Sequence, residues 1–184
     1  MNKEKTDKKI NYLFLDIHII AQNPDDCEIF IKNLDKQCEK IKKKKINYFT
    51  KSINEKNFAL KINPMKIEDL FEKKDYISNY FIWFLLDRNN YQNFNYLLNN
   101  IINLNKITEK KPILIILCYY KGNKEFEVED SDLELLVERM NENYPYFNYT
   151  NVFNFDDSNY LTVILEKLEN FNISSNIKSK CIIF

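Results

Sequence analysis

Apolar and polar positions along the chain predict an alternation of strands and helices. Short apolar runs rich in β-branched and aromatic residues predict strands at 11–20, 46–50, 58–62, 80–86, 112–120 and 147–155. Apolar residues that recur every three to four positions predict helices from Asn23 to about Ile41, from Asn89 or Asn90 to about Leu104, from a capping box at Ser131-Asp132-Leu133-Glu134 to about Met140, and from Asp157 or Ser158 to about Leu168. The acidic and lysine-rich stretch 65–75 is expected to form either a short helix or a loop.

The first helix has the clearest boundary signals. Asn23 is a favourable N-cap, and Pro24 suits the first helical position. Asp25 and Asp26 suit the positive end of the helix dipole, and we interpret them as helix-start charges rather than as metal ligands. The lysine run 42–45 is expected to close this helix with positive charge.

This order of elements predicts one three-layer α/β/α domain over residues 11–171. Fully apolar strands indicate a mostly parallel sheet of six strands with helices on both faces. The second and third strands follow each other without a helix, so they are expected to pair antiparallel. A polar extension, residues 1–10, precedes the domain. The polar tail, residues 172–184, is expected to be flexible because it lacks helical or strand periodicity.

Charge, cysteine and histidine content narrow the classes of site and partner. The 27 basic and 27 acidic residues cancel, so the chain lacks the basic field that nucleic-acid binding requires. Four scattered cysteines and one histidine do not predict an ordinary zinc site, and no metal is expected. We interpret His18 as structural rather than catalytic, and Cys27 and Cys118 as small core residues.

Membrane contact is expected to depend on a lipid. The amino end lacks a signal-peptide pattern, and no run of about 18 uncharged apolar residues is present. The sequence Cys181-Ile-Ile-Phe184 matches a prenylation signal, and its phenylalanine favours a geranylgeranyl group on Cys181. One lipid with few basic neighbours gives reversible attachment. The predicted location is therefore the cytoplasmic face of a membrane, with a cytosolic pool.

Two stretches resemble a known family. The run Tyr80-Phe-Ile-Trp-Phe-Leu-Leu-Asp87, with Phe94 after a polar stretch, is similar to the fourth strand and following turn of Rab-type small GTPases of the Ras superfamily. The run Pro112-Ile-Leu-Ile-Ile-Leu-Cys-Tyr-Tyr-Lys121 lies where that family has its fifth strand and its Asn-Lys-x-Asp motif. The resemblance implies a Ras-like domain with strand order 2-3-1-4-5-6, in which strand 2 is antiparallel.

The phosphate-binding residues of that family have no counterparts at the corresponding positions. A G-x-x-x-x-G-K-[ST] loop needs bare backbone around the phosphates, yet the only glycine is Gly122, and Gln22 and Asn23 stand in the loop. The Asp-x-x-Gly that senses the terminal phosphate is replaced around Asn63. Asp25 and Asp26 would repel a phosphate at the helix start.

The guanine-binding motifs are also replaced. Asn-Lys-x-Asp corresponds to Cys118-Tyr-Tyr-Lys121, and the Ser-Ala-Lys loop corresponds to Thr150-Asn-Val152. Phosphoryl transfer in this class depends on positioning and charge stabilisation by the missing elements. The sequence therefore predicts neither GTP hydrolysis nor tight GTP binding.

The resemblance and the tail together imply a membrane-anchored Rab-like pseudo-GTPase that acts as a protein-interaction module in vesicle traffic or signalling. The implied partners are a prenyltransferase, protein effectors of unknown identity and an extraction chaperone. Residues 182–184 would be removed after lipid attachment. No catalytic residue and no cofactor besides the lipid are expected.

Two other hypotheses stay open. The chain could be a divergent small GTPase that binds GTP or GDP with Mg²⁺ through an atypical loop and regulates membrane traffic. It could also have the α/β fold and the lipid without Ras ancestry, which the strand order would distinguish.

Aromatic residues are concentrated in the second half of the chain: Tyr119, Tyr120, Tyr144, Tyr146, Phe147 and Tyr149. We interpret them as filling the sheet edge where the family has its guanine pocket. An exposed patch for a partner protein is the alternative.

Overall fold

A computed structural model of the protein describes residues 12–40, 47–72, 81–107, 111–121, 125–144, 146–153 and 159–170. The strands are β1 (Tyr12–Ala21), β2 (Glu39–Lys40), β3 (Asn47–Ile53), β4 (Lys56–Pro64), β5 (Phe81–Asp87), β6 (Ile113–Tyr119) and β7 (Phe147–Phe153). The helices are α1 (Pro24–Gln37), α2 (Ile67–Glu72), α3 (Tyr91–Ile107), α4 (Asp130–Asn141) and α5 (Tyr160–Asn170). The predicted extension 1–10, the lysine run 42–45 and the tail with Cys181 lie outside the described residues.

The strands form one sheet in the order β2-β3-β4-β1-β5-β6-β7. The pairs from β4 through β1, β5 and β6 to β7 are parallel, whereas β3 is antiparallel to β4 and β2 is antiparallel to β3. The predicted α/β class, the mostly parallel sheet and the antiparallel pair are therefore confirmed.

The sheet has seven strands rather than six because the first helix is shorter than predicted. Helix α1 ends at Gln37, not near Ile41, and Cys38 adopts extended backbone geometry. The ammonium of Lys51 donates a hydrogen bond to the Gln37 carbonyl at 3.0 Å, which satisfies one of the carbonyls left unpaired at the helix end. The chain then continues as the two-residue edge strand β2, which pairs with β3.

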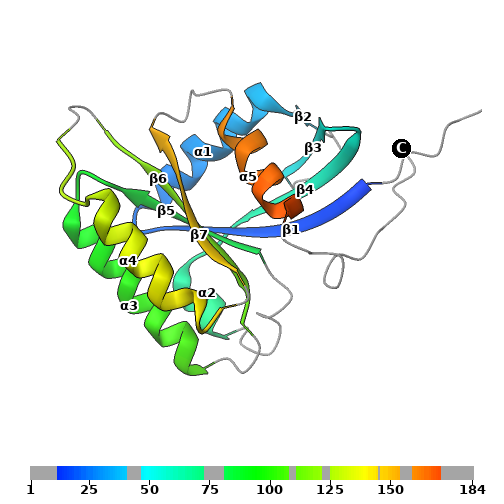
Figure 1. Ribbon diagram of the computed structural model, residues 1–184. Coiled ribbons are helices and arrows are strands. Elements are labelled where there is room, and N and C mark those ends of the chain that lie inside the picture. The colour runs from blue at the N-terminus through cyan, green and yellow to red at the C-terminus, as the bar shows by residue number, and fades with distance from the viewer. Residues whose placement is uncertain are drawn as a thin grey trace, which may run out of the picture.

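Helices cover the sheet in two layers (Figure 1). Alternate sheet residues such as Trp83 and Ile115 belong to a core with α1 and α5, whereas Phe84 and Ile116 belong to a core with α2, α3 and α4. The six apolar residues at the start of β5 and all seven residues of β6 are buried, which explains their continuous apolar sequence. Within the described residues, no helix combines the length and apolar composition needed to cross a bilayer.

The predicted N-cap of α1 is confirmed, but the predicted capping box of α4 is wrong by two residues. Asn23 Oδ1 accepts a hydrogen bond from the Asp25 backbone N–H at 3.2 Å. Helix α4 begins at Asp130, with Glu129 as its N-cap, and the Asp132 carboxylate accepts from the Glu129 N–H at 3.0 Å. Several carboxylates precede this helix, so an earlier acidic residue takes the capping position and Ser131 falls within the first turn.

A two-residue turn connects β3 and β4. Asn54 and Glu55 both have positive φ angles, 48° and 64°, which suits the right-handed twist of a hairpin. Asparagine tolerates this left-handed conformation, whereas glutamate adopts it at a steric cost that glycine would not have.

We expect Glu55→Gly to stabilise the protein by about 0.5–1 kcal/mol, because relief of the left-handed backbone outweighs the added flexibility of the unfolded chain. The measurement is urea unfolding followed by circular dichroism. Lys56→Gly is the matched control. Lys56 begins β4, so glycine there should be destabilising by about 0.5–1 kcal/mol. Equal losses of stability in both variants would contradict the prediction.

Candidate functional site

The carboxyl ends of the parallel strands are the natural place for a site in this fold. Ligands of open α/β sheets bind in the crevice outside these strand ends, where the strand order switches direction. Here the switch lies at β1, which has β4 on one side and β5 on the other. The register pairs Asp87 with Tyr119, so the ends of β5 and β6 lie next to each other. The side chains at this edge define the candidate site.

The turn from β1 into α1 is short. Strand β1 ends at Ala21 and α1 begins at Pro24, so Gln22 and Asn23 alone connect them, and both are exposed. Asn23 caps the helix through its side chain, and its carbonyl accepts from the Asp26 N–H at 3.1 Å. The two positions singled out from the sequence thus lie at the carboxyl edge of the sheet, where Asn23 caps the helix.

Asp26 is the central residue of the site. It lies in the first turn of α1 and is 2% exposed. Its carboxylate accepts from the Tyr119 hydroxyl at 2.5 Å and from the Lys121 ammonium at 2.6 Å. The positive end of the helix dipole adds to this stabilisation. A buried carboxylate is tolerated because both of its oxygens have strong donors.

This arrangement confirms that both acidic residues lie at the start of α1, and it adds a pairing that the sequence did not predict. Asp25 is an exposed helix-start charge, as predicted, but Asp26 is buried and paired with Lys121. The sequence did not reveal the pair because its members are 95 positions apart. Lys121 is half-exposed, and its ammonium lies 5.6 Å from the centre of the Tyr119 ring, so the tyrosine contacts both charges of the pair.

Burial raises the pKa values of several side chains near Asp26. The pKa of Tyr119 is raised by burial and by its bond to Asp26, so the hydroxyl remains a donor. The pKa of Asp87, at the end of β5, is also raised, mainly by burial. Burial and the nearby Asp26 charge raise the pKa of Cys27 to about 12, and burial raises that of Cys118 as well. Both thiols are buried and non-nucleophilic near neutral pH, in agreement with the prediction that they are core residues.

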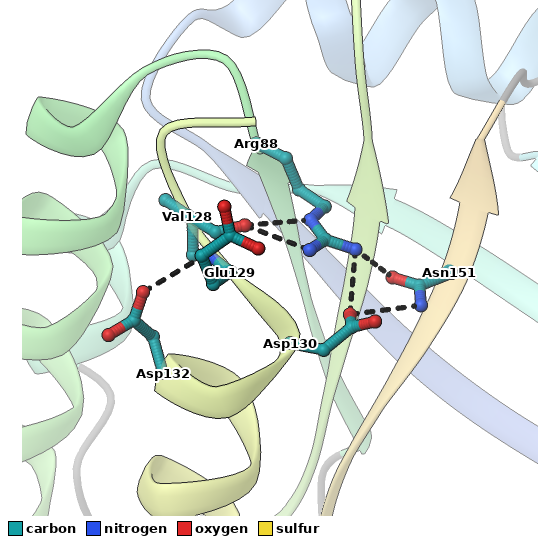
Figure 2. A network of polar contacts seen from close by, with 6 residues as sticks. All are labelled: Arg88, Val128, Glu129, Asp130, Asp132 and Asn151. Atoms are coloured by element: carbon teal, nitrogen blue, oxygen red, sulfur yellow. Dashed lines mark hydrogen bonds and ion pairs between the residues drawn. The ribbon is translucent and has the colours of Figure 1, made fainter. Parts of the chain in front are cut away.

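A second network, centred on Arg88, adjoins this edge (Figure 2). Arg88 follows β5 directly and is 1% exposed. Its Nε and Nη2 donate to the Val128 carbonyl at 3.0 and 2.9 Å. Its Nη1 donates to Asp130 Oδ1 at 2.8 Å and to Asn151 Oδ1 at 3.1 Å. One guanidinium thereby connects the end of β5 with the segment before α4 and with β7.

The backbone of Arg88 strengthens the same connection. Its carbonyl accepts from the N–H groups of Glu127 and Val128, and its own N–H donates to the Tyr119 carbonyl at 2.8 Å. The guanidinium carbon lies 4.1 Å from the centre of the Phe126 ring, within the range of a cation–π contact. The segment 125–129 is therefore fixed to β5 by backbone, charge and aromatic contacts.

Sequence reasoning assigned no role to Arg88. The available signal was an arginine directly after a fully apolar strand, in a chain whose basic residues are otherwise almost all lysine. Arginine presents several donors in a rigid plane, which suits a position where carbonyl, carboxylate and amide acceptors converge.

The other sequence-predicted positions do not join the Asp26 group. Asn63, at the end of β4, donates to Asp16 Oδ1 at 2.6 Å, beside an ion pair between Asp16 and Lys61 of 2.7 Å. Cys118 is buried in the core with α3 and α4, and Thr150 is buried in β7. Of the six nucleotide-related positions, the structure brings Asn23 and Lys121 to the first turn of α1, with Gln22 beside them.

His18 is buried in β1, and its Nε2 lies 3.9 Å from Asp16 Oδ1. Among the described residues, no three His, Cys, Asp or Glu side chains are grouped as metal ligands.

The interpretation of the six aromatic residues as one sheet edge is wrong for four of them, one of which, Tyr149, pairs with Ile116 inside the sheet. Tyr119 and Tyr120 lie at the carboxyl edge, and Tyr120 packs on Phe126 with ring centres 5.7 Å apart. Tyr144, Tyr146 and Phe147 precede or begin β7, so the parallel sheet places them at its opposite edge. The Tyr144 hydroxyl donates there to the Ile101 carbonyl at 3.0 Å. Aromatic residues that are close together in the sequence therefore lie at different places in the sheet, most of them at its two opposite edges.

We expect Arg88→Lys to destabilise the protein by about 2–3 kcal/mol, because an ammonium cannot reproduce the fork of donors to Val128, Asp130 and Asn151. Urea unfolding at low protein concentration measures the change. Arg139→Lys is the matched control, since Arg139 is exposed on α4, and it should change stability by less than about 0.5 kcal/mol. Equal stability of the two variants would show that the network is dispensable.

Comparison with known proteins identified no relative of this chain. No protein-family model matches the chain, and no curated protein is similar enough in sequence to count as a match. The function is therefore inferred from the fold and from the residues at the edge of the sheet.

Proposed function

We propose that the protein is a membrane-anchored, Rab-like pseudo-GTPase that acts as a protein-interaction module in vesicle traffic or signalling, without hydrolysing GTP. The observation that carries the proposal is the buried carboxylate of Asp26 at the start of α1, held by Tyr119 and Lys121. It lies at the helix start where a nucleotide-binding relative would accept phosphate groups.

The strand order supports the Ras-like part of the proposal. Apart from the two-residue strand β2, the order is β3-β4-β1-β5-β6-β7. Numbered without β2, this is 2-3-1-4-5-6, with the second strand antiparallel. The resemblance implied this arrangement, and it weighs against an unrelated α/β fold.

The first turn of α1 opposes phosphate binding for two physical reasons. A connection of two residues, Gln22 and Asn23, offers few backbone N–H groups for wrapping phosphate oxygens. The Asp26 carboxylate already accepts the local donors, including the Lys121 ammonium. A phosphate would gain the Lys121 ammonium only by taking it from Asp26, which would leave a buried carboxylate without its counter-charge.

The residues where the family binds guanine also oppose binding of the base. At the position where the family carries a guanine-accepting carboxylate, this chain has Lys121, and the Tyr119 hydroxyl is bonded to Asp26. Guanine presents N–H donors at the edge that such a carboxylate binds, so an ammonium there provides no acceptor. The chain thus lacks the carboxylate that would accept from guanine, and the donors of Tyr119 and Lys121 are already bonded to Asp26. Both features favour a nucleotide-free module.

We expect neither GTP nor GDP, each with Mg²⁺, to raise the melting temperature of the protein at about 1 mM nucleotide. A ligand present at about one hundred times its Kd would stabilise the fold by about 2.7 kcal/mol, which is readily detected. Release of bound nucleotide on denaturation, followed by chromatography, provides the second measurement, and ATP is the control ligand. Guanine nucleotide recovered in near-stoichiometric amount would instead support the alternative of a divergent GTPase.

The membrane part of the proposal depends on Cys181-Ile-Ile-Phe184, which lies outside the described residues. A prenyltransferase would attach a geranylgeranyl group to the Cys181 thiol, and an extraction chaperone would account for a cytosolic pool. Effector proteins would then meet the domain at the membrane surface.

We expect Cys181→Ser to move a fluorescent fusion from membranes to the cytosol, because the mutation removes the thiol that receives the lipid. Phe184→Met is the matched variant. It keeps the cysteine and should change the attached lipid from geranylgeranyl to the shorter farnesyl, as measured by the mass of the intact protein. An unlipidated wild-type protein in eukaryotic cells, or membrane binding that persists in Cys181→Ser, would contradict the anchor.

A further inference from the structure

An apolar groove runs between α3 and α4, which lie side by side on one face of the sheet (Figure 1). Its volume is about 290 Å³, and Tyr91 and Leu98 of α3 and Leu135 and Met140 of α4 contribute to its lining. Two of these side chains are unusually exposed for their size, Tyr91 at 43% and Leu135 at 47%. Apolar side chains that stay accessible beside a groove are typical of a surface that binds another protein.

The charges beside this groove have a symmetric arrangement along α4. Asp132, Leu135, Leu136 and Arg139 occupy positions i, i+3, i+4 and i+7, so they share one stripe of the helix. The acidic residue lies three positions before the leucine pair, and the basic residue lies three positions after it. When such a stripe meets a copy of itself running in the opposite direction, each acid meets a base and the two exposed Leu135 side chains lie near the centre, whereas Leu136 packs against the sheet.

The two charged residues have groups available for a partner. Within the described part of the chain, the Arg139 guanidinium makes no ion pair. Asp132 uses its Oδ2 to accept from the Glu129 N–H. A carboxylate accepts several hydrogen bonds, so Asp132 can cap α4 and also pair with an arginine.

We infer that the α3–α4 face binds a second copy of this chain, with the two α4 helices antiparallel about a two-fold axis between Leu135 and Leu136. An isologous contact of this kind requires each residue to meet the partner's counterpart in both directions, and the Asp132–Arg139 stripe meets that requirement. Leu135 and Tyr91 supply the apolar centre, and the two reciprocal ion pairs fix the antiparallel direction.

The expected dimer is weak and concentration-dependent. Two helices from each copy form a contact at the lower end of the size range of specific interfaces, so we expect a Kd of about 10–100 µM. This inference does not depend on nucleotide binding or lipid attachment. It is tested on the full-length, unlipidated chain by sedimentation velocity over a concentration series.

The first test substitutes the apolar centre. Leu135→Asp should raise the dimer Kd at least tenfold, whereas Val163→Asp should leave it unchanged. Val163 is the matched control because it is similarly exposed, at 40%, but lies on α5, which packs on the opposite face of the sheet. A wild-type protein that stays monomeric up to about 500 µM would overturn the inference. So would equal effects of the two substitutions.

The second test uses charge exchange. Arg139→Asp gives a stripe with two acids, and Asp132→Lys gives a stripe with two bases, so each variant alone should be monomeric. An equimolar mixture should form a heterodimer, because each acid of one chain then meets a base of the other. Circular dichroism verifies that Asp132→Lys, which removes a capping carboxylate, retains its helices. If that variant unfolds, Arg139→Asp and Leu135→Asp alone decide. Self-association of either charge variant as strong as that of the wild type, or no association in a folded mixture, would refute the reciprocal pairing.

Discussion

The burial of one carboxylate, that of Asp26, constrains the carboxyl edge of the parallel strands. A charge taken out of water must be matched by donors, and here the donors come from the end of β6 and from the dipole of α1. This requirement fixes α1 against β6, turns the Tyr119 hydroxyl inward and holds Lys121 over the helix start. The short connection between β1 and α1 places the Asn23 side chain at the helix start, where it caps α1.

The Arg88 network performs a related task on the other side of the sheet. In proteins that bind a ligand at this edge, contacts with the ligand help to hold the surrounding loops. Here a single guanidinium bonds β5, the segment before α4 and β7, and a ring of the same segment stacks on it. Both networks use internal charges to stabilise loops. The proposed nucleotide-free state is consistent with such a design, since the stability of the edge then comes from the chain itself.

The sequence predicted the elements better than it predicted the site. Continuous apolar runs such as β6 and the N-cap at Asn23 are local signals, so periodicity and capping rules located them correctly. The end of α1 was misplaced because the chain leaves the helix to pair with β3, a distant contact that periodicity does not encode. The start of α4 was misplaced because several carboxylates in a row offer equivalent capping residues. Asp26, Tyr119 and Lys121 were each noted, yet their association depends on the parallel pairing of distant strands. Arg88 was missed because its acceptors include a backbone carbonyl, whose direction no sequence pattern encodes.

The long separation between Asp26 and Lys121 has a consequence for biosynthesis. The two residues are 95 positions apart, and at usual translation rates the acid leaves the ribosome roughly 5–20 seconds before its cation. Until β6 is available, the nascent chain can form α1 but cannot bury the carboxylate without a counter-charge. The packing of the start of α1 against the end of β6 can therefore be completed only after Lys121 has been synthesised.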